Sequence, residues 1–185
     1  ALLGDAQGFS PLNQINTGNV QNLQMEWVYS LQQPNLETTP IVVDGAMFVT
    51  AADKVCALGA GTGRELWCFA YTEPTADGRR RNPGAVNRGV AVDGERVFVA
   101  TIDGRLQALN RDDGRELWST RTFDPAAPYT ITGAPRVVRD MVVIGNGGAE
   151  YGVRGFVSAY DVATGPCAGA STPYPAIPPT APMAP

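Results

Sequence analysis

Apolar and polar residues alternate along most of the chain in short runs that are separated by tight turns. The segments Pro40–Thr50, Gly89–Thr101 and Ala134–Gly145 each contain an alternating run, a turn and a second alternating run. A period of two is typical of β-strands with one buried face, and two such runs around a turn predict a β-hairpin. The chain therefore contains three predicted hairpins of one kind.

A second pair of alternating runs follows each hairpin, in Lys54–Trp67, Arg105–Trp118 and Phe156–Gly165. Trp67 and Trp118 lie 51 residues apart, and alanines at 57, 108 and 159 repeat the same spacing. Four strands in about 50 residues, repeated in register, are typical of β-propeller blades. We predict an all-β fold, a partial β-propeller of about three four-stranded blades preceded by a strand at Met25–Leu31. The alternative is a β-sandwich whose hairpins are similar by chance.

The third repeat differs from the other two at one position. The first two units read TGRELW and DGRELW, whereas the third reads TGPCAG and has Gly169 where the tryptophan is expected. Beyond Gly165 the alternation ends, and Pro, Ala, Ser and Thr predominate. We therefore predict a propeller segment at 1–165 and a Pro/Ala-rich, non-native or disordered tail at 166–185, with a genuine linker as the alternative for the tail.

Composition narrows the class of protein. The 185 residues are 44% hydrophobic and 17% charged, which is enough to bury a core. The net charge of −4 argues against nucleic acid as a partner, because phosphate binding favours a basic face. The chain has no histidine, which excludes histidine-based triads, most zinc sites and the CxxCH haem attachment. No apolar run long enough for a membrane span is present, and no signal peptide is recognisable.

Two repeats share the pattern A-x-x-x-x-x-G-x-x-x-W, which resembles the tryptophan-docking motif of quinoprotein dehydrogenases. Other stretches agree in the same order, among them FSPLNQINTGNVQNLQMEWVYSL, ETTPIVVDGAMFVT, PYTITGAPRVV and GNGGAEYGVRGFVSAYDVATG. The region 9–165 is similar to the N-terminal portion of PQQ-dependent (quinoprotein) alcohol dehydrogenases, which fold as eight-bladed propellers. The resemblance implies an oxidoreductase that converts primary alcohols to aldehydes by hydride transfer to Ca²⁺-bound PQQ. It also implies a periplasmic location and a cytochrome c electron acceptor.

The resemblance assigns three polar residues to the cofactor. Glu37 of ETTP matches the acid that hydrogen-bonds the quinone, and Arg88 of NRG matches the cation that pairs with a PQQ carboxylate. Thr132 of TGAP matches a hydroxyl donor to another carboxylate of the same cofactor. The alternative is that Glu37 and Arg88 are ordinary exposed charges at strand ends and that Thr132 is a plain strand residue.

The resemblance also assigns the loop GNGGAE. Gly147, Gly148 and Ala149 match small residues whose backbone approaches the cofactor, where a side chain would occupy the space of the ring. Glu150 matches a carboxylate ligand of Ca²⁺, with a lanthanide ion as the alternative metal. Taken alone, the loop is equally a plain glycine turn. The sequence NRDDGRE at 110–116 superficially resembles a calcium loop, but we predict a tight turn there.

The cysteines depart from the family pattern. Many members carry a vicinal disulfide where this chain has Asn82 and Pro83, inside an unusually basic loop at 77–82 that is expected to reshape the entrance. Cys56 and Cys68 flank a hairpin turn, and they form either a cross-strand disulfide or two buried thiols. Cys167 lies in the predicted tail and is left out of any disulfide scheme.

Family elements that complete the catalytic site come later in the chain than Gly165. They are the aspartate base, an asparagine ligand of Ca²⁺ and a tryptophan beneath PQQ, so we assign no catalytic residue and expect little or no turnover from the monomer. Open blade edges make a homo-oligomer possible. A non-catalytic propeller scaffold, such as an outer-membrane assembly lipoprotein, is the alternative function.

The tail itself suggests a shift of reading frame. Permitted codons for the residues after Gly165, taken two bases further on, allow a continuation that contains WRFYTVPGDP. That continuation begins with the missing tryptophan and resembles the family. We therefore predict that one base is missing near Gly165–Pro166, which sequencing of the coding DNA tests.

Overall fold

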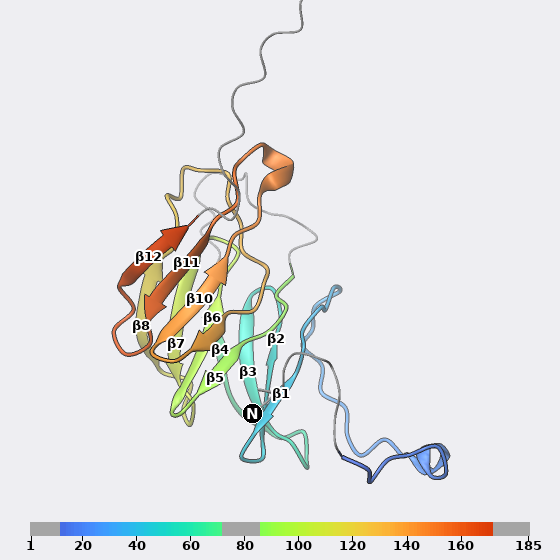
Figure 1. Cartoon of the computed structure of the whole chain (residues 1–185). Helices are drawn as coiled ribbons and strands as arrows, with labels where there is room; N and C mark the ends of the chain where they lie inside the picture. The colour runs from blue at the N-terminus through green and yellow to red at the C-terminus, as the bar shows by residue number, and fades with distance from the viewer. Residues whose placement is uncertain (1–11, 72–85, 172–185) are drawn as a thin grey trace, which may run out of the picture.

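The computed structural model describes residues 12–71 and 86–171. Its twelve strands form three four-stranded antiparallel sheets, as predicted (Figure 1). Sheet 1 comprises β1 (Ile41–Val43), β2 (Ala46–Thr50), β3 (Lys54–Gly59) and β4 (Glu65–Ala70). Sheet 2 comprises β5 (Ala91–Asp93), β6 (Arg96–Ala100), β7 (Arg105–Asn110) and β8 (Glu116–Arg121). Sheet 3 comprises β9 (Arg136–Val138), β10 (Met141–Gly145), β11 (Val157–Asp161) and β12 (Cys167–Ser171).

Local sequence explains the hairpins. The β1–β2 pairing ends at Val43 opposite Ala46, which leaves a two-residue turn of Asp44 and Gly45. Both turn residues have left-handed backbone angles, with φ of 49° and 78°. An Asp-Gly turn of this kind matches the right-handed twist of its flanking strands, so these two residues fix the register of the hairpin.

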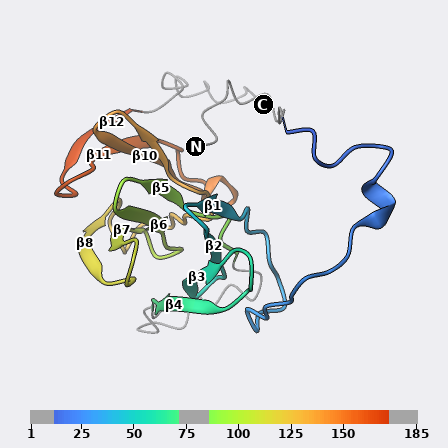
Figure 2. The same cartoon turned by 90° about the horizontal axis from the view of Figure 1, so that it is seen from below.

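The three sheets follow one another as blades, with their inner strands side by side (Figure 2). Phe48 and Trp67 of sheet 1 pack against Val97 and Leu109 of sheet 2. The opposite face of sheet 2 packs against sheet 3 through a second cluster that includes Phe98, Val142, Ile144 and Tyr160. Each interface buries apolar side chains of both neighbours, so the core consists of layers between sheets rather than one central cluster.

Tryptophans link each layer to the next. The indole N–H groups of Trp27, Trp67 and Trp118 donate to the carbonyl oxygens of Ala60, Arg111 and Val162, at 3.1, 2.9 and 3.1 Å. Each ring also lies on the left-handed glycine of a turn, Gly63, Gly114 or Gly165, where a Cβ atom would come within 2.5–2.6 Å of the ring. The recurrent contact explains why the repeats require both the tryptophan and the glycine. Trp27 is a third docking tryptophan that the spacing of 51 residues does not reveal.

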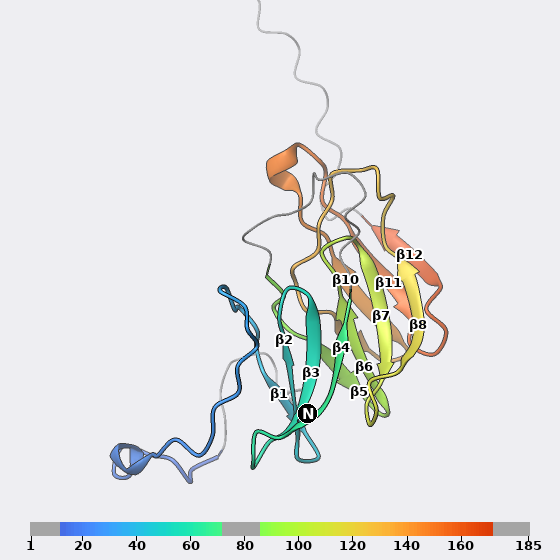
Figure 3. The ribbon, with the colours of Figure 1, turned by 180° about the vertical axis from the view of Figure 1, so that it is seen from behind.

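The predicted strand at Met25–Leu31 belongs to none of the twelve strands, so that part of the prediction is corrected. The alternation is nevertheless present, because Trp27, Tyr29 and Leu31 face sheet 1 while Val28 is exposed. Figure 3 shows this segment running beside β2 and then leaving the sheets toward the single-turn helix η1 (Val20–Asn22). Side-chain packing holds this segment against sheet 1. A β-strand requires a ladder of backbone hydrogen bonds to a neighbouring strand, and the segment does not form one.

The predicted tail begins at Pro166, and its first residues continue sheet 3. Cys167–Ser171 forms β12, which pairs with β11 and leaves all five of its residues exposed. Cys167 is a free, exposed thiol. Residues 172–185 lie outside the described part of the chain, and the origin of the tail stays a prediction.

A disulfide joins Cys56 of β3 to Cys68 of β4, which decides between the two predicted states of these cysteines. The Tyr29 hydroxyl donates to a carboxylate oxygen of Glu65 and lies 3.5 Å from the Cys68 sulfur. Burial raises the pKa of Tyr29 to about 12, and the hydrogen bond to Glu65 adds to the effect. This cluster fastens the N-terminal segment to the outer part of sheet 1.

Three further predictions concern the segment NRDDGRE, a membrane span and the basic loop. The segment NRDDGRE is the turn between β7 and β8, where the side-chain oxygen of Asn110 accepts from the backbone N–H groups of Asp112 and Asp113 at 2.9 and 3.2 Å. No helix in the described ranges is long and apolar enough to cross a membrane. The basic loop at 77–82, together with Pro83, lies outside the described residues.

Candidate functional site

Three of the predicted site residues occupy equivalent positions in the three sheets. Glu37, Arg88 and Thr132 each lie three or four residues before the innermost strand of a sheet, respectively β1, β5 and β9. These inner strands contact one another in sequence, β1 with β5 and β5 with β9. The repeat therefore brings three residues that are far apart in the chain to one end of the inner strands.

Side chains join this trio directly. One terminal nitrogen of Arg88 lies 2.7 Å from a carboxylate oxygen of Glu37, and the other donates to the hydroxyl of Thr132. The two charged side chains are 49% and 50% exposed, so the guanidinium remains accessible to a ligand. The sequence predicted these residues one by one, and the structure brings them together as one cluster.

Backbone hydrogen bonds hold the same three segments together. The Thr39 N–H donates to the carbonyl of Arg88 at 3.1 Å, and the Arg88 N–H donates to the carbonyl of Thr132 at 2.9 Å. Gly89 lies in the left-handed region with φ of 128°, and a Cβ there would lie 3.1 Å from the Thr39 carbonyl oxygen. A glycine beside Arg88 thus permits the close approach of the segments that carry the cluster.

Asn87 directly precedes Arg88 and is buried, and the sequence analysis did not identify it as part of the site. Its side chain, 4% exposed, donates to the carbonyl of Ala100 at 2.8 Å and to the Tyr71 hydroxyl at 3.3 Å. Its amide oxygen accepts from the Gly89 N–H at 3.0 Å, and its carbonyl accepts from the buried Thr50 hydroxyl at 3.0 Å. A satisfied buried network of this kind fixes the backbone of its neighbour. A polar residue inside the apolar run VNRGVAV was the one available signal.

The glycine loop lies next to the segment of Thr132. Gly147 pairs with Thr130 by two backbone hydrogen bonds of 2.6 and 3.2 Å. A Cβ on Gly147 would meet the Thr130 hydroxyl at 2.9 Å, and one on Gly148, whose φ is 116°, would meet the Pro128 carbonyl at 2.6 Å. Close packing within the chain is therefore sufficient to explain why both positions are glycine. Their role toward a cofactor stays a prediction.

Ala149 and Glu150 lie apart from the trio in the contact network. They belong to the single-turn helix η2 (Ala149–Tyr151), and both are exposed. No recorded hydrogen bond or ion pair of the described residues connects Glu150 to Glu37, Arg88 or Thr132. Within 12–71 and 86–171, no group of three or more metal-binding side chains is present. Since Ca²⁺ takes six to eight oxygen ligands, Glu150 by itself does not make a metal site.

The cluster is chemically suited to an anionic ligand with carboxylates. A guanidinium has five N–H donors in a planar fork, and Arg88 uses its two terminal nitrogens for Glu37 and Thr132. The remaining donors and the Thr132 hydroxyl can bind a carboxylate, while Glu37 fixes the orientation of the fork. The residues present therefore fit a polycarboxylate such as PQQ.

Comparisons with known proteins identify the family of the chain. The family model described as "PQQ: Glucose/ethanol/alcohol dehydrogenase, beta-propeller domain" matches residues 4–169. The quinohemoprotein alcohol dehydrogenase ADH IIB of Pseudomonas putida is 50% identical over 161 residues, which are 86% of this chain and 23% of that protein. The 1-butanol dehydrogenase (cytochrome c) of Thauera butanivorans is 48% identical over 83% of this chain and 23% of its own length.

Solved structures of alcohol dehydrogenases are similar to this chain in fold. The quinohemoprotein alcohol dehydrogenase ADHIIG of Pseudomonas putida superposes with a TM-score of 0.79 at 49% identity, over 86% of this chain and 24% of that one. BamB of Moraxella catarrhalis, at a TM-score of 0.56, 21% identity and coverage of 78% and 39%, is alike in fold alone. The chain spans about a quarter of the length of the dehydrogenases that it matches. It belongs to the PQQ-dependent glucose/ethanol/alcohol dehydrogenase β-propeller family.

Proposed function

We propose that the chain forms part of a periplasmic alcohol dehydrogenase in which PQQ is the redox cofactor, Ca²⁺ its metal and a primary alcohol its substrate. The observation that carries the proposal is the exposed trio of Glu37, Arg88 and Thr132, assembled from equivalent positions of three sheets. A scaffold protein needs no such cluster, and the likeness to BamB is one of fold alone.

The residues of this chain bind and orient the cofactor in the proposal. Arg88 and Thr132 hold carboxylates, Glu37 keeps the guanidinium in place, and the backbone of Gly147 and Gly148 leaves room for a flat ring. When bound, PQQ supplies the quinone that accepts the hydride of the alcohol. Glu150 contributes one oxygen ligand to Ca²⁺, and further ligands come from other groups.

Apart from Glu37, which is paired with Arg88, no carboxylate of the described residues has a hydrogen bond or ion pair with the trio. We therefore propose that the 185-residue chain alone has little or no turnover, because the base must lie within hydrogen-bond reach of the alcohol. Ethanol oxidation with a soluble dye as acceptor tests this point. Sustained Ca²⁺- and PQQ-dependent turnover by the chain would contradict it.

The relatives support the remaining assignments. The protein of Thauera butanivorans is named for 1-butanol and for cytochrome c, which agrees with a primary alcohol as substrate and a cytochrome c as electron acceptor. A lanthanide ion remains the alternative metal. Titration with Ca²⁺ and with La³⁺ at constant PQQ distinguishes the two, since the tighter ion gives the lower midpoint.

Binding of PQQ to the 185-residue chain is the direct test of the site. Quinone absorbance and tryptophan quenching should report Ca²⁺-dependent binding. Arg88→Ala should weaken that binding by about 10- to 100-fold, because a charge-assisted hydrogen-bond pair is lost. The control is Arg115→Ala, which removes an exposed arginine from the β7–β8 turn, where it pairs with Asp113. Absence of Ca²⁺-dependent binding, or equal weakening by both variants, would overturn the proposed site.

A further inference from the structure

A buried threonine, Thr50 at the end of β2, links the two segments that carry Glu37 and Arg88. Thr50 is 0% exposed. Its hydroxyl oxygen lies 2.9 Å from the hydroxyl oxygen of Thr38, which directly follows Glu37. The same hydroxyl lies 3.0 Å from the carbonyl oxygen of Asn87, which directly precedes Arg88. A threonine hydroxyl can donate one hydrogen bond and accept others, so both contacts can be made together.

The segment after Glu37 is anchored by two consecutive threonines. Thr38 is half-buried between the exposed residues Glu37 and Thr39. Besides its contact with the Thr50 hydroxyl, the Thr38 hydroxyl accepts from the backbone N–H of Thr50 at 3.0 Å. The Thr39 N–H donates to the carbonyl of Arg88 at 3.1 Å. The side chain of Thr38 therefore fixes the segment to β2, and the backbone of Thr39 fixes it to Arg88.

The ion pair of Glu37 and Arg88 does not by itself fix where its two side chains lie. They are 50% and 49% exposed. Exposed ion pairs contribute little free energy, because water and salt screen the charges and the ordering of two long side chains costs entropy. A buried hydrogen-bond network holds its members more firmly, since a broken bond leaves a buried polar group without a partner. The position of the ion pair therefore depends on the buried contacts of Thr50.

The hydroxyl of Thr50 is not a requirement of the blade itself, as the strand register shows. Each sheet has an equivalent row of three residues across its second, third and fourth strands. The rows are Phe48, Ala57 and Trp67 in sheet 1, Phe98, Ala108 and Trp118 in sheet 2, and Val143, Ala159 and Gly169 in sheet 3. Two residues after the first member of each row come Thr50, Ala100 and Gly145. Of these three equivalent positions, the one beside the Glu37 segment carries the hydroxyl.

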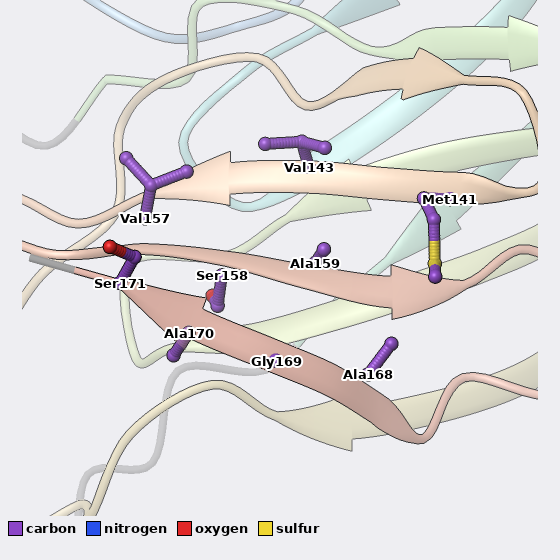
Figure 4. A pocket seen from close by; sticks show the side chains of 9 residues that line it. All are labelled: Met141, Val143, Val157, Ser158, Ala159, Ala168, Gly169, Ala170 and Ser171. Atoms are coloured by element: carbon purple, nitrogen blue, oxygen red, sulfur yellow. The ribbon is translucent and has the colours of Figure 1, made fainter.

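Sheet 3 shows the same plan without a side chain at this position. Its row of Val143, Ala159 and Gly169 lies on neighbouring strands and lines a hollow of about 430 Å³ (Figure 4). No further sheet of the described residues lies over this row, and its face is called the open face of sheet 3. Gly145, the equivalent of Thr50, is exposed. A four-stranded sheet of this kind therefore forms without the hydroxyl.

We propose that Thr50 is a positioning residue of the cofactor site. Its buried hydroxyl, bonded to Thr38 and Asn87, sets the separation of Glu37 and Arg88 and so holds the guanidinium in one orientation toward the carboxylates of the cofactor. The inference rests on the proposed function, in which Arg88 binds PQQ. A guanidinium that is already oriented loses less freedom when the ligand binds, and the difference contributes to affinity. Thr50 acts through Arg88, because a fully buried side chain offers no surface to the ligand.

Two substitutions separate the hydroxyl from the rest of the Thr50 side chain. Thr50→Val keeps the shape but removes the hydroxyl, and it should weaken PQQ binding to the 185-residue chain about 3- to 10-fold. Thr50→Ser keeps the hydroxyl and should bind PQQ within about twofold of the unmodified chain. In the Arg88→Ala background, Thr50→Val should alter binding by less than about twofold, because a positioning residue has no effect once the group that it positions is gone.

Amide hydrogen exchange gives a readout that needs no cofactor. The Thr39 N–H, which donates to the Arg88 carbonyl, should exchange at least about tenfold faster in Thr50→Val, and at the unmodified rate in Thr50→Ser. Circular dichroism reports whether the variants fold. If Thr50→Val does not fold, Thr38→Val removes the other hydroxyl of the pair at a half-buried position and is expected to have the same effects.

The matched control is Thr101→Val in sheet 2. Thr101 is 1% exposed, and its hydroxyl bonds to the Asp103 carboxylate and to the carbonyl of Arg105. This variant also loses a buried hydroxyl, but one that has no hydrogen bond to the segments of Glu37 and Arg88. It should lower the midpoint of unfolding in urea while PQQ binding and the exchange rate of the Thr39 N–H stay unchanged.

The outcomes separate this inference from the proposed function. If the unmodified chain does not bind PQQ, the proposed function fails and this inference fails with it. If the unmodified chain binds PQQ and Thr50→Val binds equally well, this inference alone is wrong. Equal weakening by Thr101→Val, loss of binding in Thr50→Ser, or an unchanged exchange rate at Thr39 in Thr50→Val would each show that Thr50 has a general structural role instead.

Discussion

The face between sheets 1 and 2 and the open face of sheet 3 share one strand register but differ in what covers them. In the first, Trp67 is 8% exposed, its ring centroid lies 6.0 Å from that of Phe48, and its N–H has a carbonyl partner in sheet 2. On the open face of sheet 3, Gly169 occupies the position equivalent to that of Trp67, and it is exposed. The backbone plan alone does not complete an interface, because half of each contact comes from the following sheet.

Removal of the Trp67 ring should have the largest effect on the free energy of unfolding. Trp67→Ala leaves a cavity between sheets 1 and 2 and should lower the free energy of unfolding by about 3–5 kcal/mol. Gly169→Ala, at the equivalent place on the open face, should change it by less than about 0.5 kcal/mol, since nothing lies within 4 Å of its Cβ position. Urea unfolding followed by circular dichroism measures both. Equal effects would mean that the two faces do not differ in the way described.

Loss of the disulfide should come next. Cys56 and Cys68 close a loop with a sequence separation of 12, so replacement of both by serine should cost about 2–4 kcal/mol. Cys167→Ser, which removes the free, exposed thiol of β12, is the control and should leave the unfolding midpoint unchanged. Unfolding in urea under non-reducing conditions gives the comparison. A larger loss in the control would place the important thiol on sheet 3.

A substitution at Gly114 of sheet 2, the glycine on which the Trp67 ring lies, tests the same interface. Gly114 has φ of 73°, and a Cβ there would lie 2.5 Å from the Trp67 ring. Gly114→Ala should therefore cost about 1–3 kcal/mol through backbone strain and crowding. Gly61→Ala is the matched control, since its Cβ position has nothing within 4 Å. Thermal unfolding of the two variants should separate them, and an unaffected Gly114→Ala would show that the ring moves aside freely.

Titration of Tyr29 should give the smallest effect, on the covered face of sheet 1. Its pKa is raised from 10.0 to about 12, so folding favours the neutral phenol. The stabilisation is fully present below pH 10 and is lost as the pH rises toward 12. Absorbance at alkaline pH should show a late-titrating tyrosine that disappears in Tyr29→Phe. Tyr160, whose pKa burial also raises, should titrate late in both proteins.

The sequence predicted the parts of the fold that repeat. Alternation around the Asp44–Gly45 turn identified the first hairpin, and the interval between Trp67 and Trp118 identified the blade. Resemblance to the family assigned Arg88 and Thr132, which the structure brings into contact. The hairpin and the blade depend on local turn chemistry and on periodicity, which one sequence displays directly, whereas the site residues required the resemblance.

Other features depend on contacts that the sequence does not display. Trp27 docks on Gly63, as the other two tryptophans do on their glycines, but it lies outside the interval of 51 residues. Asn87 acts through buried hydrogen bonds, and its place in VNRGVAV does not show that Ala100 and Tyr71 are its partners. The cysteine pair remained open until Cys56 and Cys68 proved to be direct cross-strand partners. Long-range packing decides each of these cases.

The bond from each docking tryptophan to a later carbonyl also bears on how such a chain folds while the ribosome is making it. The acceptor of Trp67 is Arg111, 44 residues further along, and the acceptor of Trp118 is Val162, again 44 residues further. Almost one complete repeat must therefore be synthesised after Trp67 or Trp118 before its indole N–H can reach this acceptor. Folding can proceed from the first blade toward the last, with one unfinished surface at the growing end at any moment.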